Sequence, residues 1–424
     1  MRRQRQTFEE VSLPIGPALL NLWGSALERI GLTPKPLDAQ DLQRTAEAAT
    51  GLGDRGEATR FDPMLEHLLE SAASEVRLTP FGRALLRQDC VSVLSNQLLA
   101  QELFRRHPEA RQVPVQRPLF LVGFFRSGTT LLQRVLGSNP RSRSLRVWES
   151  LRPVSEELSP RGASGDGRVA AAESDIRILR RFVPPKVHLL DAQAPEEDLF
   201  LLRHMFSSVF QWALFGGDSY LRHLLEQDAR PTYEYLRALL QALQWQAPGG
   251  SWILKTGQHL LDLDVIAEAF PDAGFVWTHR DPAELVPSFL STIACLRSGS
   301  HARPMDLPRL AGNCLEMVDA ALTRAMQSKV VREEDRIVHL PYTRLVEDPA
   351  GAAADIFERF DLPLDDVAVR QMHGWVAANP QHRWGRHNYV LETFGLEARD
   401  VNSRYSEYAS RFIATGGETA MEAG

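Results

Sequence analysis

The chain has 424 residues, of which 44% are hydrophobic and 24% are charged, and its formal net charge at pH 7 is −6. This composition predicts a globular protein with one large core or two modest ones, and the negative charge argues against general nucleic-acid binding. The three cysteines, Cys90, Cys295 and Cys314, are widely spaced and form no CxxC pair, so neither a disulfide framework nor a zinc site is expected. No apolar run approaches the roughly eighteen residues that a membrane span needs.

The first hundred or so residues carry helical periodicity and few strand signals. Asp62-Pro63 and Thr79-Pro80 each combine an N-cap residue with a first-turn proline, which predicts that helices begin there. We therefore expect a helical N-terminal extension over residues 1–113 and an α/β domain over residues 114–424. The extension leaves two roles open, a cap over an acceptor pocket or a homodimer interface.

Apolar runs typical of strands alternate with helical segments from Arg117 onward. The runs are 119–123, 252–255, 274–278 and 337–340. Alternation of this kind predicts an α/β fold, with a P-loop-type parallel sheet flanked by helices and ligands at the carboxyl ends of the strands.

The first of these runs leads into a glycine-rich turn that opens a helix. The spacing from Gly123 to Gly128 fits the nucleotide-binding pattern GxxxxGK[ST], but Thr129 occupies the lysine position and Arg126 is the nearby cation. Backbone N–H groups at such a turn favour an anion, an arginine can fork onto its oxygens, and Thr129 and Thr130 add hydroxyl donors. A turn without a ligand is the alternative.

A second cluster follows the third run. His279-Arg280-Asp281-Pro282 predicts a strand end and a helix start, with Asp281 as N-cap and Pro282 as first helical residue. Ser288 lies eight positions after Arg280, so a guanidinium and a hydroxyl can converge on a second phosphate. A capped helix start alone also explains the motif.

Together, the Arg126-Ser127-Gly128-Thr129-Thr130 loop and the later Arg280 and Ser288 resemble the signature of sulfotransferases that use 3′-phosphoadenosine-5′-phosphosulfate (PAPS). The resemblance is nearest to the large bacterial branch of that family and covers roughly residue 117 to the end. It implies that the loop holds the 5′-phosphosulfate, that Arg280 and Ser288 hold the 3′-phosphate, and that Tyr342 lies near the nucleotide.

Some positions depart from the family pattern. Leu131 stands where cytosolic animal enzymes place a tryptophan on adenine, so adenine contacts must come from elsewhere. Lys255 and His259 resemble a bacterial Lys-x-Pro-x-His stretch in which Gly257 replaces the proline, and both remain candidate site residues. In the late segment 382–389, Arg386 and His387 are candidates for the 3′-phosphate, with surface decoration as the alternative.

The resemblance implies in-line transfer, in which Arg126 stabilises the leaving phosphate and a protein base takes the acceptor's proton. Glu149 is the first candidate for the base, because tyrosylprotein-type sulfotransferases place a catalytic glutamate similarly, and a surface salt bridge is its alternative. His188 is the competing base, since cytosolic members use a histidine. The acidic run Glu196-Glu197-Asp198 is interpreted as helix capping.

The sequence thus predicts a cytoplasmic sulfotransferase that moves a sulfuryl group from PAPS to a hydroxyl or amine of a small molecule, releasing 3′-phosphoadenosine-5′-phosphate without a metal. A P-loop NTPase or small-molecule kinase is the alternative, and it would need a Mg²⁺-binding acid such as Asp262, Asp264 or Asp348. A nucleotide-binding protein without catalysis is the third possibility. Aromatic residues between 151 and 252 are interpreted mainly as helix core rather than as an acceptor pocket.

Overall fold

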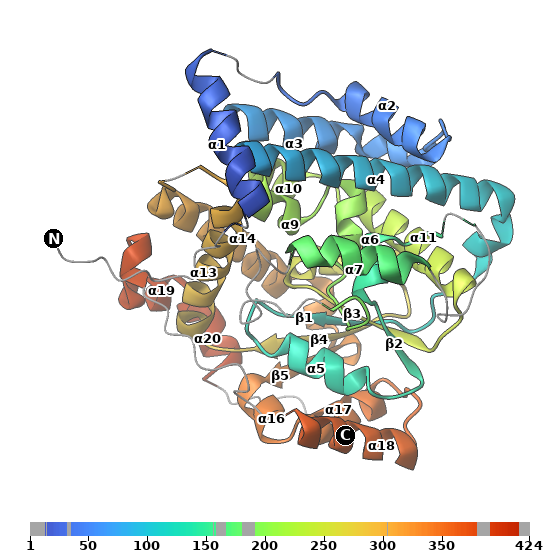
Figure 1. Ribbon diagram of the computed structural model, residues 1–424. Helices are drawn as coiled ribbons and strands as arrows, with labels where there is room; N and C mark the ends of the chain where they lie inside the picture. Colours follow the sequence, from blue (N-terminus) through green and yellow to red (C-terminus); the bar gives the residue numbers. More distant parts are fainter. Residues whose placement is uncertain are drawn as a thin grey trace.

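A five-stranded parallel sheet lies at the centre of the protein (Figure 1). The computed structural model describes residues 13, 15–31, 35–155, 157, 167–179, 191–302, 304–379 and 391–414. The strands follow the order β2-β3-β1-β4-β5, and every neighbouring pair is parallel. Their bounds are Leu119–Val122 (β1), Ser142–Ser144 (β2), Ser251–Lys255 (β3), Gly274–His279 (β4) and Ile337–Pro341 (β5).

The predicted α/β fold is confirmed, and the four predicted runs match β1, β3, β4 and β5 to within one residue. The strand β2 was missed, because its sequence Ser-Arg-Ser carries no apolar signal. Alternate residues of β1 face opposite layers: Phe120 and Val122 enter the larger core, while Leu119 and Leu121 enter a second core on the other face. Burial on both faces is why the run is continuously apolar.

Two unequal helical layers cover the sheet (Figure 1). The smaller layer is built from α5, α16, α17 and α18, and the larger one holds most of the remaining helices. The bounds on the smaller side are Thr129–Leu136 (α5), Tyr342–Glu347 (α16), Pro349–Arg359 (α17) and Asp366–Ala378 (α18). The other helices after β1 are Val147–Leu151 (α6), Gly167–Leu179 (α7), Leu199–Leu202 (α8), Val209–Leu214 (α9), Asp218–Glu226 (α10), Arg230–Gln246 (α11), Leu263–Ala269 (α12), Pro282–Ser300 (α13), Leu307–Gln327 (α14), Lys329–Arg332 (α15), Ala398–Arg404 (α19) and Ser406–Phe412 (α20).

The N-terminal segment is helical as predicted, and it packs on the larger layer. Its helices are Ile15–Arg29 (α1), Ala39–Thr50 (α2), Asp62–Ser74 (α3) and Pro80–Arg106 (α4). Leu94 of α4 and Phe120 of β1 belong to one continuous core, so the helices stabilise the sheet directly. The boundary at residue 113 stays a prediction.

Both predicted N-terminal helix starts exist, but only one cap has the predicted form. The Thr79 hydroxyl accepts a hydrogen bond from the Gly82 N–H at 3.0 Å, as expected of an N-cap before Pro80. Asp62 is instead the first residue of α3, and its carboxylate pairs with Arg55 at 2.7 Å. The cap prediction was therefore wrong for Asp62, because a buried arginine takes its carboxylate. None of the helices in the described ranges has the length and apolar character needed to cross a bilayer.

Candidate functional site

The turn between β1 and α5 is wound tightly around the start of the helix. Gly123 and Gly128 have φ angles of 146° and 97°, which side-chain-bearing residues rarely adopt. A Cβ on Gly128 would lie 2.7 Å from the Leu345 side chain, and one on Gly123 would lie 2.4 Å from Thr278 Oγ1. Glycine alone fits at both positions, and the resulting turn exposes the N-terminus of α5, where N–H groups and the helix dipole favour an anion.

The polar side chains of this loop divide into two pairs. Ser127 and Thr129 are buried, whereas Arg126 and Thr130 are exposed. The Ser127 hydroxyl donates to the Phe124 carbonyl at 2.6 Å and lies 2.7 Å from Thr278 Oγ1 on β4. Ser127 therefore braces the loop against the sheet, and Arg126 and Thr130 are the loop side chains available to a ligand.

Lys255 supplies the lysine that the loop itself lacks, in addition to Arg126 in the loop. It is the last residue of β3, the strand next to β1, and its ammonium donates to Thr130 Oγ1 at 3.2 Å. Its side chain is only 3% exposed and also pairs with the Glu197 carboxylate. A lysine from the neighbouring strand thus reaches the helix start that position 129 would serve in the usual nucleotide-binding pattern.

Glu197 is the residue that the sequence interpretation missed. One of its carboxylate oxygens bonds Lys255, and the other is buried with no hydrogen-bond partner within the described part of the chain. A buried carboxylate oxygen without a donor is costly unless a ligand supplies one. Glu197, Lys255 and Thr130 therefore form a chain of polar contacts from a free acceptor atom to the loop.

A second set of buried contacts fixes this lysine and glutamate in place. The Asp198 carboxylate accepts from the Lys255 backbone N–H at 2.8 Å and from the His259 ring at 2.6 Å, and the other ring nitrogen of His259 lies 3.0 Å from the Tyr233 hydroxyl. Asp198 makes no capping bond to α8, so interpretation of the acidic run as simple capping was wrong for this residue. His259 has no exposed side-chain surface and acts as a support for Asp198.

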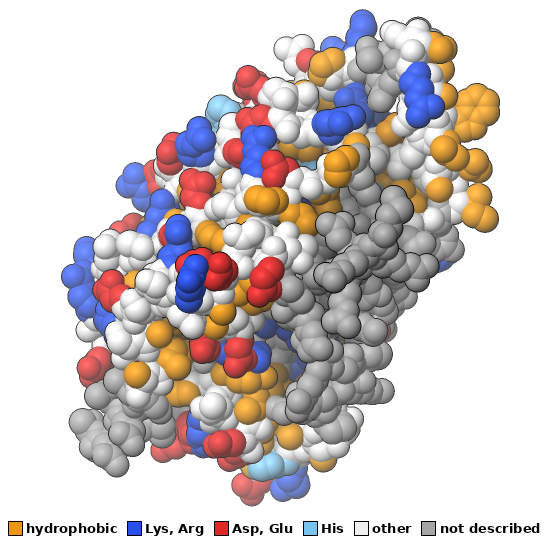
Figure 2. Space-filling view, turned by 90° about the vertical axis from the view of Figure 1, so that its left-hand side faces the viewer, with side chains coloured by type: hydrophobic (Ala, Val, Ile, Leu, Met, Phe, Trp, Pro, Cys, Tyr) orange, Lys and Arg blue, Asp and Glu red, His pale blue; other side chains and the backbone are white. Residues whose placement is uncertain are grey.

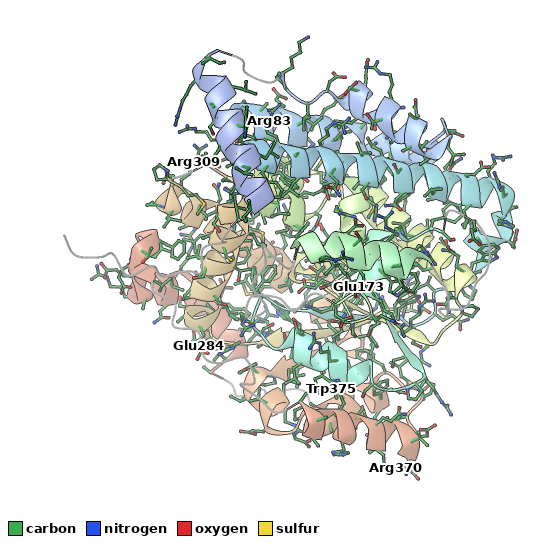
Figure 3. All side chains as sticks on the ribbon, viewed as in Figure 1. Arg83, Glu173, Glu284, Arg309, Arg370 and Trp375 are labelled. Atoms are coloured by element: carbon green, nitrogen blue, oxygen red, sulfur yellow. The ribbon has the colours of Figure 1, made fainter. Side chains whose placement is uncertain are left out.

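Arg280 links the two predicted phosphate motifs. Its guanidinium donates to the Arg126 carbonyl at 2.8 Å and lies 4.2 Å from the centre of the Tyr342 ring. The Arg280 Nε also donates to Glu284 at 2.8 Å. Glu284 lies at the foot of α13 and is 57% exposed, so this pair is weak and an incoming phosphate can replace it (Figure 3).

Tyr342 lies beside Arg280, and Ser288 lies on the helix that follows it. Ser288 lies on α13, which begins at Pro282 with Asp281 as N-cap, as predicted. Its hydroxyl is buried without a hydrogen-bond partner in the described ranges. A Cβ on Gly128 would lie 3.1 Å from the Tyr342 ring, so Tyr342 packs directly on the phosphate loop. The predicted residues Arg126, Gly128, Arg280 and Tyr342 thus come together at the carboxyl ends of β1, β4 and β5.

A neutral histidine pair lies beneath this arginine. His279 Nε2 is 2.8 Å from His339 Nδ1, and its other ring nitrogen is 2.9 Å from the Tyr408 hydroxyl. Burial lowers the pKa of His339 to about 4, and burial together with His339 holds the pKa of His279 well below its ordinary value. The pair therefore carries no charge at neutral pH, and Arg280 provides the local positive charge.

Glu149, the first candidate for the base, lies in a closed environment. One carboxylate oxygen pairs with Arg143 at 2.7 Å, and the other accepts from the Arg146 backbone N–H at 3.0 Å, which caps α6. The Glu149 side chain is 5% exposed. Both oxygens are thus used in local structure, which favours a structural role.

Three further candidates, His188, Arg386 and His387, lie outside the described residues, and their roles stay predictions. Two of the three acids considered for Mg²⁺ are engaged elsewhere, and the third, Asp262, is buried. Asp348 caps α17 through the Gly351 N–H at 2.9 Å, and Asp264 accepts from the Ser328 hydroxyl at 2.5 Å. Burial raises the pKa of Asp262 to about 6. The described ranges contain no group of three histidine, cysteine or acidic residues placed to hold a metal ion.

Comparison with known proteins agrees with this geometry. The model of the sulfotransferase family matches residues 118–366. The omega-hydroxy-beta-dihydromenaquinone-9 sulfotransferases Stf3 of Mycobacterium bovis and Mycobacterium tuberculosis are each 21% identical over 324 residues, which are 72% of this chain and 76% of the relative.

Solved structures give a closer likeness. The sulfotransferase STF1 from Mycobacterium tuberculosis H37Rv has a TM-score of 0.77 at 27% identity, covering 88% of this chain and 99% of that chain. The sulfotransferase STF9 from Mycobacterium avium has a TM-score of 0.78 at 28% identity, covering 88% and 96%.

Proposed function

Because the chain belongs to the sulfotransferase family, we propose that it transfers a sulfuryl group from PAPS to a hydroxyl group of a small-molecule acceptor. The observation that carries the proposal is the bond between Arg280 and the Arg126 carbonyl. It places the two motifs that we propose as anion sites next to each other, which suits a nucleotide with phosphate groups at both the 5′ and 3′ positions.

The residues present fit this nucleotide. Arg126 and Thr130 expose their side chains at the loop, and the Ser288 hydroxyl is a buried donor without a partner among the described residues. We assign Arg126, Thr130 and Lys255 to the 5′-phosphosulfate, and Arg280 and Ser288 to the 3′-phosphate. When bound, PAPS supplies the sulfuryl group, and 3′-phosphoadenosine-5′-phosphate is the product.

Glu197 is the base in this proposal. Its unpartnered oxygen accepts the proton of the acceptor hydroxyl as the acceptor oxygen bonds to sulfur and the bond from sulfur to the phosphate oxygen breaks. Lys255 and Arg126 offset the charge that develops on the leaving phosphate. The buried Asp198 and His259 keep Lys255 oriented, so little rearrangement is required.

The acceptor class comes from the relatives. The name of Stf3 states that it acts on omega-hydroxy-beta-dihydromenaquinone-9, a hydroxylated menaquinone. The match covers about three quarters of each protein, so we propose an acceptor of the same type, an alcohol on a long apolar molecule. An amine acceptor is the alternative to the alcohol in this proposal. We also propose that the N-terminal helices cover the bound acceptor.

Nucleotide binding is tested first by thermal shift with 3′-phosphoadenosine-5′-phosphate, ADP and ATP, each with and without Mg²⁺. A ligand that binds only the folded state raises the melting temperature by mass action. We expect metal-independent stabilisation by the 3′-phosphorylated nucleotide, and its loss in Arg280→Ala. The control is Arg370→Ala on α18, which lies far from Glu284 and the start of α13 and should keep the stabilisation (Figure 3). Equal stabilisation by ATP with Mg²⁺ and no effect of Arg280→Ala would establish the kinase alternative.

Transfer is tested with PAPS carrying ³⁵S in the sulfuryl group and a panel of long-chain alcohols, phenols and amines. Label is expected to appear in a long-chain alcohol. Nucleotide binding without transfer to any member of the panel would favour a binding protein over an enzyme.

A further inference from the structure

The helix α1 has its apolar side chains on the outside. The α1 stripe consists of Ile15, Leu19, Leu22, Trp23, Leu27 and Ile30, and its exposed fractions reach 80% for Ile15 and 71% for Trp23 and Ile30. Spacings of three and four residues place these side chains on one helical face. Of the large apolar residues exposed in the described ranges, all but Leu20 and Val367 belong to this stripe. A soluble protein rarely concentrates apolar surface in this way without a use for it.

The opposite face of α1 holds the helix firmly in this orientation. The Asn21 side chain accepts a hydrogen bond from the Phe81 N–H at 2.8 Å, at the start of α4. A Cβ on Gly24 would lie 2.3 Å from the Pro80 ring, so the two elements touch closely. Polar and small residues therefore face the protein, and a rotation that buried the stripe would break these contacts.

Basic side chains border the stripe. Arg29 is exposed at the end of α1, and exposed Lys35 follows it in the chain. Arg83 of α4 lies beside α1 and donates to the Lys35 carbonyl at 2.6 Å (Figure 3). Figure 2 shows hydrophobic side chains projecting from one end of the molecule with Lys and Arg side chains next to them. Because the whole chain carries a net charge of −6, this local positive charge marks a surface suited to an anionic partner.

The size and shape of the stripe favour a lipid surface over a second protein. A helix of 15 residues is about 22 Å long and about 10 Å wide, so the stripe is a single narrow strip of side chains. A stable protein interface is a broader patch of roughly 20 to 30 residues from each partner. A bilayer requires no matching surface, and an apolar helical face that contains a tryptophan and is bordered by cations is the pattern of helices that lie in the membrane interface.

We propose that α1 docks the protein on an anionic bilayer, with the α1 stripe inserted among the acyl chains and Arg29, Lys35 and Arg83 at the headgroups. The docking does not depend on the proposed reaction, although it would bring the site to a membrane-borne acceptor. It is peripheral binding, which agrees with the lack of a spanning helix in the described ranges.

The test is co-sedimentation of the full chain with vesicles of phosphatidylcholine alone or with 30% phosphatidylglycerol. Wild type should bind the anionic vesicles, and Leu19→Gln/Trp23→Gln should bind them at least tenfold more weakly. The matched control is Val367→Gln on α18, which removes an apolar side chain 48% exposed outside the stripe and should leave binding unchanged. Arg29→Gln/Lys35→Gln should weaken binding to the anionic vesicles and reduce its salt dependence.

Lack of binding by wild type, or equal binding by wild type and Leu19→Gln/Trp23→Gln, overturns the proposal. A wild-type dimer in sedimentation velocity that becomes a monomer in that variant, without vesicle binding by either, identifies a second copy of the chain as the partner instead. Thermal shift with 3′-phosphoadenosine-5′-phosphate on the same variants shows whether they fold. That measurement also separates a failure of the docking proposal from a failure of the nucleotide assignment.

Discussion

Replacement of Glu197 by glutamine separates the two candidate bases. If Glu197 takes the acceptor's proton, Glu197→Gln should lower kcat by about 10² to 10⁴, the usual contribution of a general base. Glutamine keeps an oxygen that can accept from Lys255, so the local geometry should survive. The change nevertheless leaves a lysine that is 3% exposed without its counter-charge, and we expect a loss of about 3 kcal/mol of stability in the absence of nucleotide.

The same substitution should strengthen nucleotide binding. Lys255 bonds both Glu197 and Thr130, the latter at 3.2 Å, so the carboxylate lies within about 6 Å of the Thr130 hydroxyl, and we take about the same distance for an anion held there. At an effective dielectric constant of about 20, two unit charges at that distance repel by up to about 3 kcal/mol. Removal of the carboxylate should therefore raise the affinity for 3′-phosphoadenosine-5′-phosphate by roughly tenfold to a hundredfold, while kcat falls.

The matched control is Glu149→Gln, which also neutralises a buried, ion-paired glutamate. Glu149 pairs with Arg143 and caps α6, so this variant should lose stability by a similar amount while kcat per folded molecule stays within about threefold of wild type. The assay is steady-state transfer of ³⁵S to the acceptor found in the panel, with the pH profile of kcat for each variant. A hundredfold loss in Glu149→Gln with near-normal kcat in Glu197→Gln would refute the assignment and restore Glu149 as the base.

For three further substitutions, the structure fixes the direction of the expected change in stability or nucleotide affinity. Burial raises the pKa of Asp262 from 3.8 to about 6, so the folded protein loses stability as the pH rises from about 4 to 6. In urea unfolding, Asp262→Asn should therefore raise the free energy of unfolding by about 3 kcal/mol at pH 8 and leave it unchanged at pH 3.5. The pH dependence due to His204 runs the other way, because burial and Arg203 lower its pKa from 6.5 to about 3. Its contribution to the free energy of unfolding is constant above pH 6.5 and falls by about 1.4 kcal/mol per pH unit between pH 6.5 and about 3. His204→Gln should remove this part of the pH dependence, which corresponds to the uptake of one proton on unfolding. Ser288→Ala removes a buried hydroxyl without a partner in the described ranges; it should leave the melting temperature of the free protein unchanged or higher and weaken 3′-phosphoadenosine-5′-phosphate about tenfold, whereas equal affinity would remove Ser288 from the site.

The parts of the fold that were predictable are those encoded by local sequence. The strand β4 is buried at all six positions, which is why its apolar run was visible, and the Asp281 cap needs only its own helix. The strand β2 has half-buried polar residues and depends on pairing with β3, a partner more than a hundred residues later. Local pattern carries no information on such a pairing.

The same distinction between local sequence signals and distant contacts applies to the candidate site. Arg126, Gly128 and Thr130 belong to one contiguous motif, and their convergence with Arg280 follows from the rule that parallel strands present their carboxyl ends at one edge. Glu197 was missed because its role depends on Lys255, 58 residues later, and because acidic residues before a helix usually cap it. Its position just before a short apolar segment gave no signal of a contact with the phosphate loop.

The location of the lysine on β3 rather than in the loop has a chemical consequence. A lysine in the loop is neutralised only by its ligand, whereas Lys255 shares its charge with Glu197 before any ligand binds. A buried ion pair contributes little to stability unless every remaining polar atom is bonded, and here one Glu197 oxygen has no donor in the described ranges. The free site is therefore under-bonded, and an anion at Lys255 together with a hydroxyl donor at Glu197 completes it. Nucleotide and acceptor should then bind cooperatively, with each tightening the other, because each satisfies one half of the same pair.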